Sequence, residues 1–206
     1  GTVLEVKREK DMFYIEAILY DGTLKVNEDI FIATLDKPIK SKIKAIFEAL
    51  PLGKGFKPVQ SVTAAAGIRM QLAKSAEVLS GMPFSTKEST ELQKEVSEAI
   101  ETSPEGIIVK ADSLGSLEAL MFLLKKENIP VGKVGIGNIN KTDVMNATAN
   151  QKIYQIVLGF NVNNEVENPE IAVLNNNVIY KLIEDFNKWL ESKKAEIEKE
   201  SISELA

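Results

Sequence analysis

Residues 106–120 decide the fold of this chain, and they read Gly106-Ile107-Ile108-Val109-Lys110-Ala111-Asp112-Ser113-Leu114-Gly115-Ser116-Leu117-Glu118-Ala119-Leu120. The apolar run at 107–111 is typical of a strand that is covered on both faces of a sheet. The spacing of Leu117, Leu120 and Leu124 predicts an amphipathic helix, because these side chains share one helix face. A strand followed by such a helix is the first half of a parallel strand–helix–strand unit.

The alternation of strand and helix continues along the chain. Further strands are expected at 131–137, 153–160 and 171–174, and a second helix is expected at about 141–150. This order predicts an α/β/α domain over 106–176 with a four-stranded parallel sheet. The connection 163–170 is too short for a crossover helix, so either it is a bare loop or the last strand is paired differently.

The end of the chain, 177–206, is expected to form one long connecting helix. Asn177 is a suitable N-cap, and an apolar stripe from Ile179 to Leu190 can pack the start of the helix on the sheet. Beyond Ile197 charged residues accumulate and the stripe thins. The helix is therefore expected to leave the domain, with a span on the order of 35 Å.

The first part of the chain, 1–84, is expected to form an all-β barrel, because short strand patterns alternate with turn residues. Asp21-Gly22 is a hairpin-turn dipeptide, and residues 39–46 alternate apolar with polar side chains. An amphipathic linker helix and a loop are expected at 85–105, since Ser85 and Glu88 have the spacing of a capping box. The predicted fold is therefore multi-domain, a β-barrel followed by an α/β/α domain and a long C-terminal helix.

Composition limits the chemistry that this chain can carry out. Among its 206 residues 44% are hydrophobic and 27% charged, which is enough for one or two globular domains. The absence of both Cys and His excludes thiolate chemistry and disulfides and removes the commonest general base. No apolar run approaches the length of about 18 residues that spans a membrane, so we interpret the chain as cytoplasmic.

Nucleotide-binding motifs are weak or missing. Gly135-Ile136-Gly137-Asn138-Ile139-Asn140 resembles a dinucleotide fingerprint, but Asn140 replaces the third glycine, and the motif does not follow the first strand of the unit. The Gly-x-x-x-x-Gly-Lys-Ser/Thr spacing of a phosphate loop occurs nowhere. We therefore expect no catalytic residue, no cofactor and no metal ion in this chain.

Basic residues are concentrated in one part of a chain whose net charge is −5. Between residues 37 and 74 Glu48 is the single acid, and the basic residues are Lys37, Lys40, Lys42, Lys44, Lys54, Lys57, Arg69 and Lys74. A solvated strand face would also explain this pattern. If the face binds RNA, lysine favours contacts to phosphate that are independent of sequence.

Several segments follow one another in an order that identifies a family. They are 106–120, Ile129-Pro130-Val131, Gly135-Ile136-Gly137 and Lys141-Thr142-Asp143-Val144-Met145. Together they resemble the third domain of translation initiation factor five-B, the archaeal and eukaryotic counterpart of bacterial initiation factor two. Residues 1–6 and 18–26 look like the opening of the second domain of that family. Because the chain begins with Gly1 rather than Met, we expect a fragment of a longer protein.

The resemblance implies a non-catalytic part of a GTPase that promotes the joining of ribosomal subunits. The barrel would rest on small-subunit ribosomal RNA, and the third domain would move with the nucleotide state. The GTPase domain, with its GTP and Mg²⁺, would precede this chain. A final barrel that holds initiator tRNA would follow the long helix, so this chain would contact the tRNA only indirectly.

Two groups of residues are assigned roles on this basis. The eight basic residues from Lys37 to Lys74 are expected to face ribosomal RNA. Transmission between domains is assigned to Leu92, Val96, Ile100, Ile179, Leu182, Phe186 and Trp189. Two other hypotheses remain open, a Rossmann-like cofactor-binding enzyme that uses Gly135 and Gly137, and a self-associating module that dimerises through its C-terminal helix.

Overall fold

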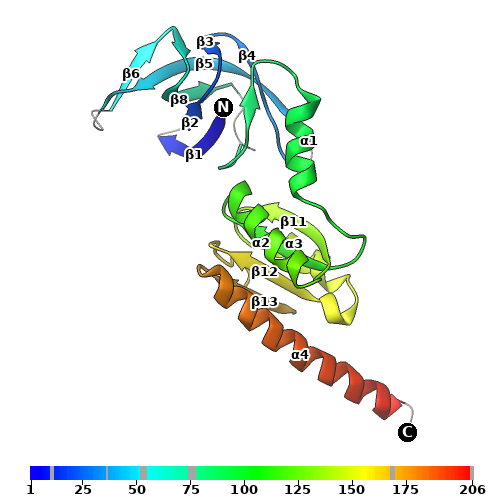
Figure 1. The fold of residues 1–206 in the computed structure, drawn as a ribbon. Coiled ribbons are helices and arrows are strands. Elements are labelled where there is room, and N and C mark those ends of the chain that lie inside the picture. Colours follow the sequence, from blue (N-terminus) through cyan, green and yellow to red (C-terminus); the bar gives the residue numbers. More distant parts are fainter. Residues whose placement is uncertain (10–11, 36, 52–54, 74–77, 168–169, 205–206) are drawn as a thin grey trace. The chain divides into compact units, whose positions relative to one another are not determined.

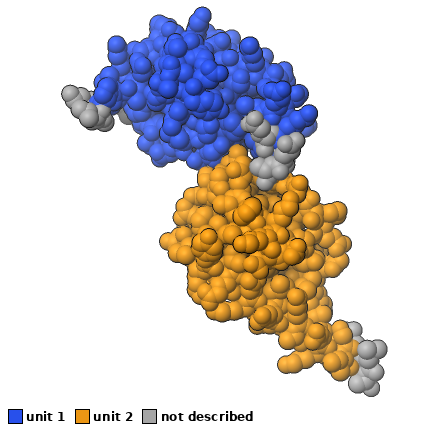
Figure 2. Space-filling view, in the orientation of Figure 1, with its two compact units in different colours: residues 1–99 blue, residues 100–206 orange. Residues whose placement is uncertain are grey.

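The computed structural model describes residues 1–9, 12–35, 37–51, 55–73, 78–167 and 170–204. The chain forms two compact units, residues 1–99 and residues 100–206 (Figures 1 and 2). The first unit is a curled antiparallel β-sheet with one helix, and the second contains a parallel sheet and a long C-terminal helix. The predicted fold class is therefore confirmed. The finer boundaries expected at 84/85 and 105/106 stay predictions.

The first unit is built from short strands and one helix. Its elements are β1 (Thr2–Glu9), β2 (Met12–Leu19), β3 (Thr23–Lys25), β4 (Asp29–Ile32), β5 (Ile39–Ala49), β6 (Phe56–Val59), β7 (Ser61–Thr63), β8 (Ala66–Leu72), β9 (Phe84–Ser85) and α1 (Thr90–Ala99). The main sheet has the order β1-β2-β8-β5-β4-β9, with β6 paired to β5, and β3 pairs with β7. Every pairing within it is antiparallel.

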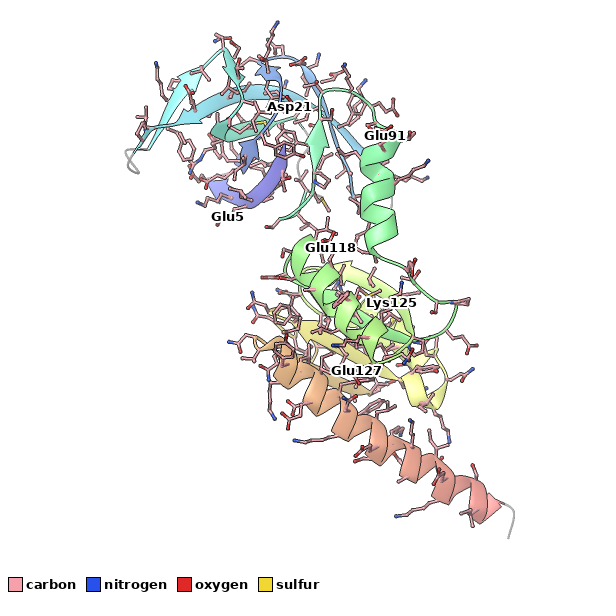
Figure 3. All side chains as sticks on the ribbon, viewed as in Figure 1. Glu5, Asp21, Glu91, Glu118, Lys125 and Glu127 are labelled. Atoms are coloured by element: carbon pink, nitrogen blue, oxygen red, sulfur yellow. The ribbon has the colours of Figure 1, made fainter. Side chains whose placement is uncertain are left out.

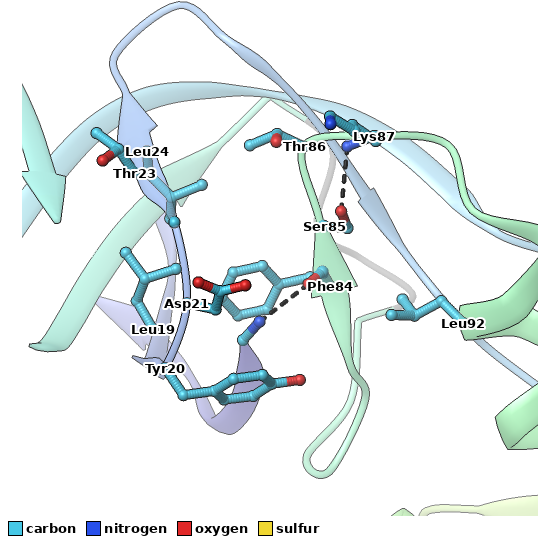
Figure 4. Close-up of a pocket in the computed structure, with 12 residues that line it drawn as sticks. Leu19, Tyr20, Asp21, Thr23, Leu24, Phe84, Ser85, Thr86, Lys87 and Leu92 are labelled. Carbon is cyan, nitrogen blue, oxygen red and sulfur yellow. Dashed lines mark hydrogen bonds between the residues drawn. The ribbon is translucent and has the colours of Figure 1, made fainter. Parts of the chain in front are cut away.

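Backbone hydrogen bonds connect the last strand of the main sheet and the segment before it to the first strand. The segment before β9 lies beside β1, because Val3 N donates to Met82 O at 2.9 Å and Phe84 N donates to Gly1 O at 2.8 Å. The amino group of Gly1 donates back to Phe84 O at 3.1 Å (Figure 4). Since β9 also pairs with β4, the ladder closes around a core that includes Ile15, Ile30 and the buried ring of Phe84.

Helix α1 begins later than the sequence predicts. Ser85 belongs to β9 and lies five residues before Thr90, the first residue of α1, so it is not the N-cap of this helix. Ser89 takes this place, because its Oγ accepts a hydrogen bond from Leu92 N at 3.3 Å. The predicted capping box at Ser85 and Glu88 is therefore wrong, because strand pairing competes for Ser85.

The side chain of Gln93 ties α1 to the loop that follows β4. Its Oε1 accepts from Thr34 N at 3.3 Å, and its Nε2 donates to Thr34 O at 2.6 Å. One amide thus satisfies both polar groups of one backbone residue, which is the pairing that a neighbouring strand would otherwise provide. Helix α1 therefore belongs to the first unit rather than standing free between the two.

The second unit alternates strands with helices, as predicted. Its elements are β10 (Ile107–Ala111), α2 (Leu114–Lys126), β11 (Val131–Ile136), α3 (Lys141–Thr148), the 3₁₀ turn η2 (Lys152–Tyr154), β12 (Ile156–Phe160), β13 (Ala172–Asn176) and α4 (Ile179–Glu204). The sheet order is β11-β10-β12-β13, and all the pairings are parallel. Because β11 and β12 lie on opposite sides of β10, right-handed crossovers place α2 and α3 on opposite faces.

Strand β10 is buried along its whole length, as its apolar run predicts. Ser113, two residues after this strand, caps α2, since its Oγ accepts from Ser116 N at 3.3 Å. The predicted stripe of α2, including Leu117, Leu120 and Leu124, is buried. On the solvent side, Lys125 in the last turn of α2 lies 2.6 Å from Glu101 (Figure 3).

The described residues between β12 and β13, 161–167 and 170–171, form no helix, which agrees with the bare loop that the sequence left as one possibility. It passes beside Ile139, whose N donates to Asn163 O at 2.9 Å and whose O accepts from Glu165 N at 3.0 Å. Val162 packs against the cluster that contains Ile139, on the face that α3 covers. The segment therefore takes the place of a crossover helix.

Helix α4 contains 26 residues and is about 39 Å long at 1.5 Å per residue. Its first half packs against β12 and β13, where Leu182 and Phe186 are each 1% exposed. Its last turns run beyond the sheet (Figure 1). Lys152 lies 2.7 Å from Glu200 and links this distal part to η2.

Gly106 and Gly115 offer a matched test of this fold. A Cβ at Gly106 would lie 2.4 Å from Pro130 O, whereas a Cβ at Gly115 meets nothing within 4 Å. We expect Gly106→Ala to lower the free energy of unfolding of the second unit by about 1–3 kcal/mol, because backbone has to move. Gly115→Ala should raise it by about 0.5–1 kcal/mol. Urea titrations followed by the fluorescence of Trp189 measure both, and equal midpoints would contradict the fold.

Candidate nucleic-acid interface

The lysines of β5 stand on its exposed face because the strand has a period of two. Lys40, Lys42 and Lys44 are exposed, while Ser41 and Ile43 between them are 5% and 0% exposed. Neighbouring side chains of a strand point to opposite faces, so burial of Ser41 and Ile43 in the core leaves the lysines exposed to solvent. We call Lys40, Lys42 and Lys44 the lysine row.

The three members of the lysine row differ in whether they form an ion pair. Lys40 Nζ lies 3.0 Å from Asp29 Oδ2 and 5.4 Å from the centre of the Phe31 ring, so its charge is partly compensated. Lys42 and Lys44 form no ion pair with any residue that the structure describes. They are therefore the cations of this strand best able to meet a phosphate.

A turn outside the predicted basic segment adds a further lysine to this region. Asn27 N donates to Ile43 O at 2.9 Å and Ile43 N donates to Glu28 O at 3.0 Å, which sets the turn between β3 and β4 beside β5. Lys25, the last residue of β3, is exposed at the start of this turn. The sequence analysis missed it, because only the pairing of the turn with β5 reveals that the two are neighbours.

The other lysines of the predicted set are more scattered. Lys37 is exposed ahead of β5, and Lys57 is exposed on β6, where it is paired in register with Glu48. Lys54 and Lys74 lie outside the described residues. The structure thus brings only part of the predicted basic set together on one strand.

Arg69 is engaged within the first unit instead. Its Nη2 lies 2.6 Å from Glu16 Oε1 and its Nη1 lies 3.0 Å from Glu9 Oε1. The guanidinium also covers the Phe56 ring at 4.4 Å and the Tyr14 ring at 5.6 Å, and the side chain is 19% exposed. The sequence could not show this, since Glu16 is 53 positions from Arg69 in the chain. We therefore place the candidate interface on the lysine row rather than on Arg69.

The same cluster perturbs the carboxyl group of Glu16. Partial burial alone would raise the pKa of Glu16, but its hydrogen bonds and attractions to Arg69 and Lys7 outweigh that effect and hold the pKa below the usual value of 4.5. Lys7 Nζ lies 3.1 Å from Glu16 Oε2 and completes the cluster. The folded barrel thus favours the ionised form of Glu16.

The residues assigned to transmission lie in both units. Val96 of α1 is buried, whereas Leu92 and Ile100 are half-buried. In α4, Leu182 and Phe186 are buried, Ile179 and Trp189 are half-buried, and the Phe186 and Trp189 rings stack with centres 6.0 Å apart. These contacts hold each helix within its own unit, and the role between units stays a prediction.

The glycines of the weak dinucleotide motif have structural roles. A Cβ at Gly135 would lie 2.9 Å from Lys110 Nζ, so glycine leaves room for this buried lysine. Lys110 in turn lies 3.3 Å from Asp143 Oδ2 at the start of α3. Gly137, with φ of 100°, makes the turn that leads into that helix.

Two further features are absent from the part of the chain that the structure describes. It contains no group of three or more acidic side chains that could hold a metal ion. None of its helices is long and apolar enough to cross a membrane.

Comparison with known proteins decides the family. Residues 83–187 match the family model described as IF-2, translation-initiation factor 2. This chain belongs to the translation-initiation factor 2 family. The match includes β9, α1, the whole parallel sheet and the start of α4.

Relatives in the translation-initiation factor 2 family extend the likeness to the whole chain. Two proteins named probable translation initiation factor IF-2 are similar over 100% of it, with 40% identity for that of Archaeoglobus fulgidus and 37% for that of Methanocella arvoryzae. A crystal structure of GDP-bound aIF5B from Aeropyrum pernix matches 98% of the chain with a TM-score of 0.70 and 30% identity. In each case the chain spans 38% of the relative's length.

The pH dependence of stability tests the cluster around Glu16. Because its pKa is lowered by folding, the stabilisation is present above the unfolded pKa of 4.5 and is lost as the pH falls through the folded pKa. We expect Glu16→Gln to lower the melting temperature of the first unit by about 4–8 °C at pH 7 and by much less near pH 3. Circular dichroism melts measure the difference.

The exposed carboxylate of Glu88 gives a control for this experiment, since it forms no ion pair with a described residue. Glu88→Gln should leave the melting temperature unchanged at both pH values. A difference between wild type and Glu16→Gln that is the same at pH 7 and pH 3 would contradict the role of the charged pair.

Proposed function

We propose that this chain is the ribosome-docking and transmission part of a translation initiation GTPase that promotes subunit joining. The barrel would dock on small-subunit ribosomal RNA through the lysine row. One observation carries this part of the proposal. Lys42 and Lys44 share an exposed strand face and form no ion pair with a described residue, although Asp29, which pairs with Lys40, is opposite Lys42 in register, in a chain whose net charge is −5.

The physical character of this surface favours phosphate over bases. Lysine is a compact point charge on a flexible stem, which suits the RNA backbone but does not read base edges. Association would release counterions from the RNA and would therefore weaken as salt is added. Lys25, close to the lysine row across the turn, would extend the same surface.

Helix α4 supports the proposed role in transmission. It is anchored by Leu182 and Phe186 at one end and held by the Lys152–Glu200 pair further along, so it can move with the parallel sheet as a rod. In the whole protein, GTP and Mg²⁺ would be bound by a GTPase domain, and initiator tRNA by a domain that α4 carries. Such a factor would act in the cytoplasm.

Sedimentation of the 206-residue chain with purified small ribosomal subunits tests the RNA surface. We expect log affinity to fall with log salt concentration at a slope of about −3, as three or four phosphate contacts require. The double variant Lys42→Gln/Lys44→Gln should bind more weakly at low salt and should reduce the magnitude of that slope by about 1.5.

A variant with the same net charge controls for non-specific electrostatics. Lys126 and Lys194 are exposed in the second unit and form no ion pair with a described residue. Lys126→Gln/Lys194→Gln should retain the slope of the wild type. Equal slopes for the two double variants would overturn the assignment of the interface to β5.

A further inference from the structure

Met12 lies on the outer face of the first unit, beside two side chains that donate hydrogen bonds to its sulfur. The Tyr14 hydroxyl donates to Met12 Sδ at 3.8 Å, and Gln71 Nε2 donates to the same sulfur at 3.2 Å. Met12 and Tyr14 are two residues apart in β2 and therefore share one face of the sheet. Gln71 of β8 is paired in register with Tyr14, so the three side chains meet on that face.

The two donors at Met12 have no stronger acceptor. Among the described residues, Met12 Sδ is the only hydrogen-bond acceptor of the Tyr14 hydroxyl and of the Gln71 amide group. The Tyr14 ring is itself held in place, since its centre lies 6.2 Å from that of Phe47 and 5.6 Å from the guanidinium of Arg69. A thioether is only a weak acceptor. The fold thus directs two donors at an atom that makes little use of them.

Exposure separates Met12 from the other methionines of the chain. Met12 is 43% exposed, whereas Met70, Met82 and Met121 are 0%, 3% and 7% exposed. Met145 on α3 is 72% exposed, but no described residue donates a hydrogen bond to its sulfur. Of the five methionines, Met12 alone is both accessible from solvent and contacted at its sulfur by donors that the structure describes.

Oxidation of the sulfur would give these donors a strong acceptor. The thioether attacks the hydroxyl oxygen of a hydroperoxide, so an S–O bond forms while the O–O bond breaks. The proton of that hydroxyl passes to the leaving oxygen, which departs as water from hydrogen peroxide or as an alcohol from an organic hydroperoxide. Sulfur loses two electrons and the peroxide gains them. A hydrogen bond between two oxygens is about 2.7 Å long, so the 3.8 Å between the Tyr14 oxygen and the sulfur leaves room for a sulfoxide oxygen.

We propose that Met12 is a site of reversible oxidation by hydroperoxides, at which Tyr14 and Gln71 hold the sulfoxide oxygen. A sulfoxide disrupts packing when it forms in a core, but at Met12 the new oxygen meets two donors at the surface. The fold therefore stabilises the oxidised form, and a methionine sulfoxide reductase would restore the thioether. This inference does not rest on the lysine row, so it stands or falls independently of the proposed RNA surface.

Treatment of the folded 206-residue chain with hydrogen peroxide tests this proposal. Met145→Leu leaves Met12 as the only exposed methionine, and Met12→Leu leaves Met145. We expect Met12 sulfoxide, quantified by peptide mass spectrometry, to raise the melting temperature of the first unit by about 3 °C or more, because two hydrogen bonds become stronger. Sulfoxide at Met145 should leave it unchanged. An unmodified Met12, or an oxidised Met145→Leu protein that melts no higher than its reduced form, would overturn the proposal.

A variant without the two donors separates their effect from that of oxidation itself. Tyr14→Phe/Gln71→Leu, made together with Met145→Leu, removes the hydroxyl and the amide but keeps the apolar parts of both side chains. Each protein is compared with its own reduced form, so a loss of stability from the substitutions cancels. We expect the rise in melting temperature to disappear in this variant. A rise of the same size with and without the donors would show that they do not hold the sulfoxide.

Discussion

The period of two along β5 is the constraint on which the first unit and its candidate interface both depend. This strand pairs with β8 on one side and with β4 and β6 on the other, so it holds the curled sheet together. Burying Ser41 and Ile43 in the core requires that Lys42 and Lys44 face outward. A shift of one residue in register would bury the lysines, and the same pairing therefore fixes both stability and surface charge.

Strand β10 has the corresponding position in the second unit. Its neighbours β11 and β12 lie on either side, and its own residues are all buried, including Lys110 with its partner Asp143. Asp143 itself is half-buried, and its removal would leave the buried ammonium group of Lys110 without a partner, which is costly. The pair joins the middle of the sheet to the start of α3.

The sequence predicts the parallel sheet and the barrel well, because period and turn residues are local signals. The prediction fails where contacts between residues far apart in the chain determine the local structure. Ser85 has the right spacing for a cap, yet pairing with β4 takes it into β9. Arg69 looks like a free cation, but Glu9 and Glu16 reach it from strands far away in the chain. The lysine row was predictable from alternation alone, whereas the proximity of Lys25 was not.

The central claim is that the β5 face of this translation-initiation factor 2 family member meets ribosomal RNA. A photoreactive amino acid placed at position 42 measures this most directly, in complexes of the chain with small ribosomal subunits. We predict crosslinks to ribosomal RNA from position 42 and few from position 126 on α2. Crosslinks from position 42 to ribosomal proteins alone, or RNA crosslinks only from position 126, would contradict the account.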